Sequence, residues 1–101
     1  MKNILMVEDD STIAFAVKYA VEQEGFNLDI SVNLENARKI VNSKEYDLIL
    51  LDVMLPDGNG YEFLKQLREH DEDTPVIFLT ACDEEVNIVR YRRRRLYNKT
   101  V

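Results

Sequence analysis

The sequence predicts one α/β domain in which a parallel sheet carries helices on both faces. Short apolar runs of strand length alternate with longer segments of helical periodicity, in the order β-α-β-α-β-α-β-α. One run is apolar at consecutive positions, as in strands that are covered on both sides. Strands separated by helices must run parallel with right-handed crossovers, and the length of 101 residues suits a single such domain.

The first strand is predicted at residues 3–7, a short apolar run. A helix follows, because Asp10 and Ser11 offer N-cap side chains and Gly25 is a typical helix stop. Between these signals apolar residues recur at helical spacing. These recurring apolar residues are Ile13, Ala16, Val17, Ala20 and Val21.

The middle of the chain repeats this pattern twice. Residues 26–32 alternate weakly and predict a second strand, after which Asn33 can cap a second helix. Residues 47–51 form the continuous run of a fully buried third strand, and residues 56–60 are a turn by composition, followed by a third helix. The expected core-facing residues of these two helices are Leu34, Ala37, Ile40, Val41, Phe63, Leu64 and Leu67.

The last unit begins at Pro75, which opens a fourth strand at residues 76–79. Residues 83–85 place carboxylates on the first turn of a fourth helix, where the helix dipole favours negative charge. Before residue 90 the sequence contains no internal repeat and no low-complexity segment. The alternation of strands and helices therefore accounts for the chain up to that point.

Composition argues against several classes of protein. No apolar run approaches the ~20 residues that a membrane-spanning helix needs, and the first residues lack a secretory signal pattern. Cys82 is the only cysteine, so an internal disulfide is impossible and a reducing cytosol is the expected compartment. One cysteine and one histidine also argue against a zinc site.

Reactive side chains follow three of the predicted strands. Glu8, Asp9 and Asp10 follow the first strand, Asp52 the third and Thr80 the fourth. The carboxyl ends of parallel strands meet at one edge of the sheet, where ligands bind. Clustered carboxylates raise one another's pKa unless a cation neutralises them, and an all-oxygen site suits Mg²⁺. A carboxylate held beside Mg²⁺ can act as a nucleophile on a phosphoryl group.

Each of these residues also has an ordinary interpretation. Three acids after a strand can be a solvated strand end that leads into a helix cap, and an aspartate after an apolar run can be a turn residue. A threonine at a strand end more often has no switching role. The joint pattern favours a functional site, because acids end the first and third strands and a hydroxyl ends the fourth strand of one sheet.

Three motifs resemble a known family. They are ILMVEDD at residues 4–10, DLILLDVMLPDGNG at residues 47–60 and PVIFLTA at residues 75–81. Together they resemble the receiver domains of bacterial two-component response regulators, over residues 2–89 without a visible gap. The resemblance implies a flavodoxin-like, doubly wound parallel sheet of strand order 2-1-3-4, to which complete members add a fifth strand.

The resemblance also implies a role for each residue of the acidic edge. Asp52 would accept a phosphoryl group from a sensor histidine kinase, and Glu8 and Asp9 would hold Mg²⁺ together with Asp52. The backbone carbonyl of Met54 would be a further metal ligand, and Thr80 would be the switch hydroxyl. Such a domain is a cytoplasmic signalling module and not a metabolic enzyme. It would reach nucleic acid only through an output domain outside this chain, and it has no expected membrane partner.

The resemblance ends near residue 90, where the charge of the chain changes abruptly. All 19 acidic residues precede Arg90, while six of the 13 basic residues lie within residues 90–101. Receiver domains have a fifth β-α unit whose strand ends in a lysine followed by proline, whereas Lys99 is followed by Thr100. We therefore interpret residues 1–89 as an incomplete receiver domain and residues 90–101 as a tail foreign to it.

A shift of reading frame explains this tail. One permitted set of codons for RYRRRRLYNKTV, read one nucleotide later, encodes DIGGDDYITKP, which resembles the receiver segment around the fifth strand. Without the catalytic lysine of that segment we expect weak phosphorylation of Asp52. We also expect the tail not to form the fifth strand, so that the fourth strand is an exposed apolar edge open to dimerisation or aggregation.

Three other functions stay open from the sequence. An arginine-rich tail can bind nucleic acid or an anionic membrane, although Tyr91, Leu96 and Tyr97 form no recognisable motif. A Mg²⁺-dependent phosphatase with an aspartate nucleophile generally needs a second acid two residues later, where Met54 stands. A receiver remnant without signalling activity is the third alternative, and acetyl phosphate with Mg²⁺ distinguishes it from an active domain.

Overall fold

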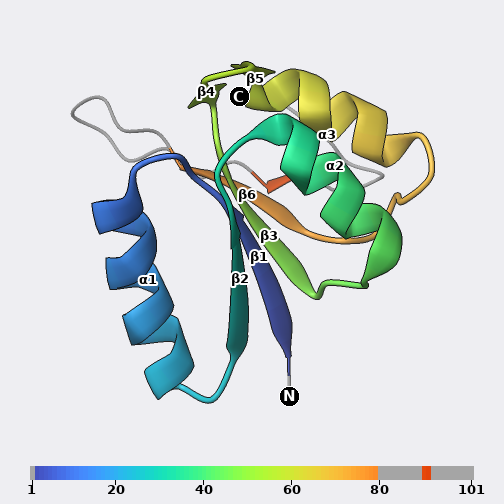
Figure 1. The fold of residues 1–101 in the computed structure, drawn as a ribbon. Helices are drawn as coiled ribbons and strands as arrows, with labels where there is room; N and C mark the ends of the chain where they lie inside the picture. The colour runs from blue at the N-terminus through green and yellow to red at the C-terminus, as the bar shows by residue number, and fades with distance from the viewer. Residues whose placement is uncertain (1, 80–89, 92–101) are drawn as a thin grey trace.

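The computed structural model describes residues 2–79 and 90–91 of the chain. Its main sheet has five strands in the spatial order β2-β1-β3-β6-β7 (Figure 1). The first four of these run parallel in the predicted order, and β7 is antiparallel to β6. The strand bounds are Asn3–Val7 for β1, Asn27–Ser31 for β2, Leu48–Asp52 for β3, Val76–Leu79 for β6 and Arg90–Tyr91 for β7.

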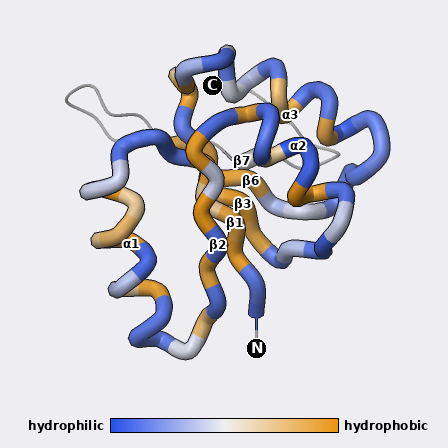
Figure 2. The backbone as a smooth tube through the Cα atoms, viewed as in Figure 1, coloured by the Kyte–Doolittle hydropathy of each residue, from blue (hydrophilic) through white to orange (hydrophobic). Residues whose placement is uncertain are grey.

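Helices cover both faces of this sheet. Figure 1 shows α1 (Ser11–Gln23) on one face, and α2 (Leu34–Ser43) with α3 (Gly60–Arg68) on the other. Alternate residues of β1 belong to two apolar cores, because Ile4 and Met6 pack on the α1 side while Leu5 and Val7 pack on the α2 and α3 side. The hydrophobic residues accordingly concentrate in the strands between the helices (Figure 2). This is the predicted doubly wound α/β architecture.

Short polar side chains begin each described helix. Asp10 accepts hydrogen bonds from the backbone N–H groups of Thr12 and Ile13 at 2.9 and 3.2 Å, which confirms it as the N-cap of α1. Asn33 caps α2 in the same way through the N–H of Asn36 at 2.8 Å. These caps fix where α1 and α2 leave the carboxyl edge of the sheet, which is the edge that carries the acidic residues.

The sheet covers only part of the apolar surface of α1. Val17 and Val21 pack against the core, together with the buried Ala14. The helix has apolar residues on more than one stripe, so its periodicity does not decide which stripe the sheet covers. Of the apolar residues that recur at helical spacing, Ile13, Ala16 and Ala20 are exposed.

The predicted turn at residues 56–60 comprises the tip and the second strand of a small hairpin and the first residue of α3. Strand β4 (Met54–Leu55) follows β3 after one residue and pairs antiparallel with β5 (Gly58–Asn59). Asn59 then caps α3 by accepting a hydrogen bond from the N–H of Tyr61 at 2.7 Å. Figure 1 shows this hairpin at the end of the sheet where α2 and α3 begin.

The outer edge of β6 is partly covered, contrary to the prediction of an open edge. Val76 pairs with Tyr91, and Ile77 pairs with Arg90, in antiparallel register. An edge strand presents unpaired N–H and C=O groups, and a short extended segment of any sequence can satisfy them. Two tail residues therefore add to the sheet, although in the direction opposite to that of the fifth strand implied by the resemblance.

Several predictions fall on residues 80–89 and 92–101, which lie outside the described residues. They concern the fourth helix at residues 83–85, and the side chains of Thr80 and Lys99. Within the described residues, no helix is both long enough and apolar enough to cross a membrane.

Candidate metal-binding acidic site

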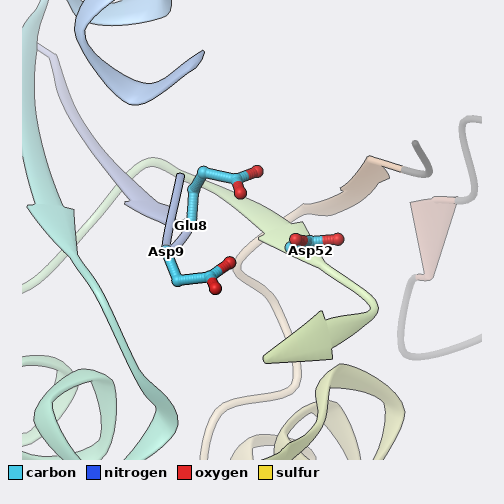
Figure 3. Close-up of side chains that lie close together, drawn as sticks. All are labelled: Glu8, Asp9 and Asp52. Carbon is cyan, nitrogen blue, oxygen red and sulfur yellow. The ribbon is translucent and has the colours of Figure 1, made fainter. Parts of the chain in front are cut away.

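The acidic residues predicted at the carboxyl ends of β1 and β3 come together in the structure. Val7 pairs with Leu51, so the residues that directly follow them, Glu8 and Asp52, lie side by side. Carboxylate oxygens of Glu8, Asp9 and Asp52 lie within 4.8 Å of one another. Figure 3 shows these three side chains around one space at the ends of the two strands.

The three carboxyl groups differ in exposure and in support. Glu8 is buried, with a relative exposure of 6%, whereas Asp52 is partly buried and Asp9 is exposed. The backbone N–H of Asp10 donates to Oε2 of Glu8 at 3.1 Å, and the N–H of Glu8 donates to the carbonyl of Ser31 at 2.9 Å. Glu8 is therefore held firmly between β1, β2 and α1, while Asp9 remains open to solvent.

Burial and mutual repulsion raise the pKa of two of these groups. Burial is the largest cause of the raised pKa of Glu8, which the charges of Asp52 and Asp9 raise further and the N–H of Asp10 opposes. Burial likewise raises the pKa of Asp52, against the backbone N–H groups of Met54 and Val53. The cluster resists carrying its full negative charge unless a cation is present.

The donor set fits a hard divalent cation. All three side chains offer carboxylate oxygens, and an all-oxygen set favours Mg²⁺ over metals that prefer nitrogen or sulfur ligands. Asp9 is exposed, so a cation bound here can keep water molecules in its coordination shell, as Mg²⁺ usually does. The same cation would remove the repulsion that raises the pKa of Glu8 and Asp52.

The other two predicted site residues are placed less fully. Met54 lies in β4, two residues after Asp52, and its side chain is exposed. Its predicted role involves only the backbone carbonyl, which such exposure allows. Leu79, the last residue of β6, pairs with Asp52, but the side chain of Thr80 lies outside the described residues.

The structure also reveals contacts of two residues in the segment after Asp52 that the sequence did not single out. Gly60, the first residue of α3, contacts the backbone of Asp52, and its N–H donates to the carbonyl of Val53 at 2.7 Å. Asp57, at the hairpin tip, accepts hydrogen bonds from two N–H groups at the start of α2. Residues 56–60 had a turn composition, which indicates no tertiary partner for either of them.

Comparisons with known proteins agree with this architecture. The family model of the response regulator receiver domain matches residues 4–97. CpxR, a transcriptional regulatory protein of Escherichia coli, is 42% identical over 89 residues, which are 88% of this chain and 38% of CpxR. The response regulator TrrA of Thermotoga maritima, in complex with Mg²⁺-BeF, has a TM-score of 0.77 at 36% identity, over 81% of this chain and 71% of that one. TrrA in complex with the histidine kinase ThkA has a TM-score of 0.77 at 36% identity, over 83% of this chain and 72% of the TrrA chain.

The curated relatives are much longer than the matched region. The chain spans only 35% to 39% of the lengths of relatives such as DltR, PhoP and AfsQ1. These relatives are named as transcriptional regulatory proteins. The function of the unmatched part of these relatives is therefore separate from the function of the matched region.

Proposed function

The chain belongs to the family of response regulator receiver domains, and on that basis we propose that it accepts a phosphoryl group on Asp52 with the help of Mg²⁺. The observation that carries the proposal is the set of three carboxylates whose oxygens lie within 4.8 Å of one another. Their convergence at the carboxyl edge of a parallel sheet, from strand ends far apart in the sequence, supports one shared ligand. The proposed role is that of a signalling domain and not of a metabolic enzyme.

In this proposal each acidic residue has a separate task. Glu8 and Asp9 hold Mg²⁺ together with Asp52 and the backbone carbonyl of Met54. The bound ion offsets negative charge on the phosphoryl group and on the carboxylates. A carboxylate oxygen of Asp52 bonds to phosphorus while the bond from phosphorus to the donor nitrogen breaks, and the electron pair of that bond leaves with the donor imidazole. Thr80 is proposed to hydrogen-bond the phosphoryl group once it is on Asp52.

The proposed donor is a sensor histidine kinase in the cytoplasm. The crystal structure of TrrA in complex with the histidine kinase ThkA supports this kind of partner. CpxR and PhoP are transcriptional regulatory proteins, which supports transcription as the output of a longer parent protein. Contact with nucleic acid is proposed only for such an output domain.

Intact-mass spectrometry after incubation of the full chain with acetyl phosphate and Mg²⁺ tests the proposal. We expect a mass increase of one phosphoryl group that peptide mapping assigns to Asp52 and that EDTA prevents. Asp47→Asn is the matched control. Asp47 directly precedes β3, at the end of the strand opposite to Asp52, and accepts a hydrogen bond from the backbone N–H of Asn3 at 2.8 Å. We expect this variant to gain the phosphoryl group and Asp52→Asn not to gain it.

An equilibrium measurement complements the acetyl phosphate assay, because it does not depend on the rate of phosphoryl transfer. Beryllofluoride binds without a chemical step, and ¹⁹F NMR detects its bound form. A wild-type chain that binds neither beryllofluoride nor a phosphoryl group, while its circular dichroism shows a folded α/β domain, contradicts the proposal. The chain would then be a receiver remnant without signalling activity.

A further inference from the structure

The tip of the β4–β5 hairpin is tied to the first turn of α2 by one side chain. Asp57 accepts hydrogen bonds from the backbone N–H of Leu34 at 2.8 Å and of Glu35 at 3.0 Å, one with each carboxylate oxygen. These N–H groups have no partner within the helix, because they belong to its first turn. Their hydrogen bonds hold the pKa of Asp57 below its usual value, with the Leu34 N–H as the largest cause.

The start of α2 therefore has a cap made from two distant parts of the chain. Asn33 binds the N–H of Asn36 at 2.8 Å from within the helix cap itself, and Asp57 binds the two preceding N–H groups from across the domain. A carboxylate at this position also interacts favourably with the positive end of the helix dipole. The carboxylate of Asp57 thus matches the start of α2 both in hydrogen-bond geometry and in charge.

Gly58 permits this contact. Its φ of +151° is a backbone conformation that residues with a side chain rarely adopt. A Cβ atom at Gly58 would also lie 2.9 Å from Cδ1 of Leu34, which is too close for an unstrained contact. The absence of a side chain at Gly58 lets the hairpin lie directly on the first residue of α2.

The hairpin connects this contact to the acidic site. Met54 and Leu55 form β4, and they pair with Asn59 and Gly58 on either side of the tip that contains Asp57. At the base of the hairpin, the N–H of Gly60 donates to the carbonyl of Val53 at 2.7 Å. Anchoring the tip to α2 therefore restricts the whole segment between Asp52 and α3, including the Met54 carbonyl.

We propose that Asp57 is a positioning residue, which holds β4 and the Met54 carbonyl in place beside Asp52 by tying the hairpin to α2. This inference rests on the metal site proposed above. It assigns part of the Mg²⁺ affinity to a carboxylate that is not itself a metal ligand. Residues that orient metal ligands typically account for factors of about 10 to 100 in metal affinity. Asp57→Ala is accordingly expected to raise the Kd for Mg²⁺ by roughly tenfold.

The experiment compares Asp57→Ala with Asp47→Ala in the full chain. Both variants remove an exposed carboxylate that binds backbone N–H groups of a distant segment, but the contact of Asp47 with Asn3 lies at the other end of β1. Mg²⁺ titrations followed by the amide resonances of Glu8 and Asp52 give the Kd of each variant. Urea denaturation gives the stability of each variant, and Asp57→Asn, which keeps one acceptor oxygen, is expected to lie between wild type and Asp57→Ala in both measurements.

A second readout needs no metal. Hydrogen exchange of the Gly60 N–H in the metal-free chain reports whether the base of the hairpin is held. We expect faster exchange in Asp57→Ala than in Asp47→Ala, after allowance for their global stabilities. Equal Gly60 exchange, or equal Kd values for Mg²⁺, in these two variants overturns the positioning role. Failure of the proposed function is distinct, because it appears as absence of Mg²⁺ binding in the wild-type chain.

Discussion

Gly60 packs so closely against the backbone carbonyl of Asp52 that no side chain fits between them. A Cβ atom at Gly60 would overlap the Asp52 carbonyl oxygen and would lie 3.2 Å from Cγ of Leu51. Both neighbours are poorly able to move, because Leu51 is fully buried and the backbone of Asp52 belongs to a central strand. The start of α3 and the acidic site therefore share one tightly packed contact.

Gly60→Ala is expected to damage stability and phosphoryl acceptance together. The added methyl group must push α3 away from β3 or displace Asp52, and overpacking of this kind costs about 1–3 kcal/mol of unfolding free energy. Urea denaturation measures the first effect, and the acetyl phosphate assay measures the second. An unchanged rate of phosphorylation would show that Asp52 does not depend on this contact.

Gly25→Ala is a matched control for that variant. Gly25 has a φ of +93°, but a Cβ atom there would meet no atom within 4 Å. Alanine in this backbone conformation costs about 1–2 kcal/mol through local strain alone. We therefore expect Gly25→Ala to lower the stability of the chain without any change in the modification of Asp52.

Asp52→Asn is expected to stabilise the metal-free chain at neutral pH. Burial raises the pKa of Asp52 and the charge of Asp9 raises it further, so the ionised carboxylate is less favourable in the folded chain than in the unfolded chain. A neutral amide removes this penalty. Urea denaturation in EDTA should therefore show a higher midpoint for the variant, and excess Mg²⁺ should reverse the order by stabilising the wild-type chain more.

The pH dependence of this difference follows from the sign of the shift. The pKa of Asp52 is higher in the folded chain than in the unfolded chain. The cost of its ionisation to the stability of the fold is therefore fully present above the folded pKa, and it disappears as the pH falls below the ordinary pKa of an aspartate. The stabilities of wild type and Asp52→Asn in EDTA should thus converge on acidification. A stability difference that grows as the pH falls would contradict this account of the site.

Tyr46→Phe is expected to destabilise the domain without affecting the acidic site. The Tyr46 hydroxyl donates to Oδ2 of Asp29 at 2.6 Å, and Nζ of Lys44 donates to the same oxygen at 2.8 Å. Loss of this charge-assisted hydrogen bond costs about 1.5 kcal/mol of unfolding free energy at neutral pH. Tyr19→Phe is the control, because the side chain of Tyr19 is exposed and loss of its hydroxyl should change little.

Acidification should remove the effect of Tyr46→Phe. Lys44 and then Tyr46 lower the pKa of Asp29, so their contribution to stability is present above the ordinary aspartate pKa and is lost as the pH falls through the lowered value. The denaturation midpoints of wild type and variant should approach each other there. Mg²⁺ affinity should be equal in both chains, and a weaker affinity in Tyr46→Phe would contradict the separation of the two sites.

The strands and the acidic site could be predicted because their signals are local or topological. The bounds of β1 and β6 agree with the prediction, since each apolar run is flanked by polar residues or proline. The convergence of Glu8, Asp9 and Asp52 follows from parallel strands whose carboxyl ends share an edge. Nothing beyond strand order is needed for that inference.

The remaining features depend on partners that are distant in the sequence. Asp57 binds the N–H of Leu34, 23 residues earlier, and a turn composition does not indicate that partner. The exposure of Ile13 depends on which apolar stripe of α1 the sheet covers. Arg90 pairs with Ile77 through backbone groups at the edge of β6. Such pairing makes little demand on the identity of the side chains, so the sequence does not indicate it.

The origin of residues 90–101 leads to a prediction about the coding DNA. We propose that this segment is read out of frame, because the same bases read one nucleotide later can encode DIGGDDYITKP. The Lys-Pro pair in that reading requires AAA as the codon of Lys99 and ACC as the codon of Thr100. An AAG codon for Lys99 would place arginine where the receiver lysine is expected, and would reject the proposal.

The restored frame also makes a prediction at the protein level. A chain that continues in the second frame would replace residues 90–101, with their six basic side chains, by a segment that carries three aspartates and one lysine, the lysine standing directly before the final proline. If that lysine contacts the phosphoryl group, the restored chain should be phosphorylated on Asp52 faster than the present one. It should also exchange the outer amides of β6 more slowly, because a full parallel strand would replace the pairing of only two residues. Equal rates in the two chains would contradict the proposal that the second frame encodes the receiver lysine.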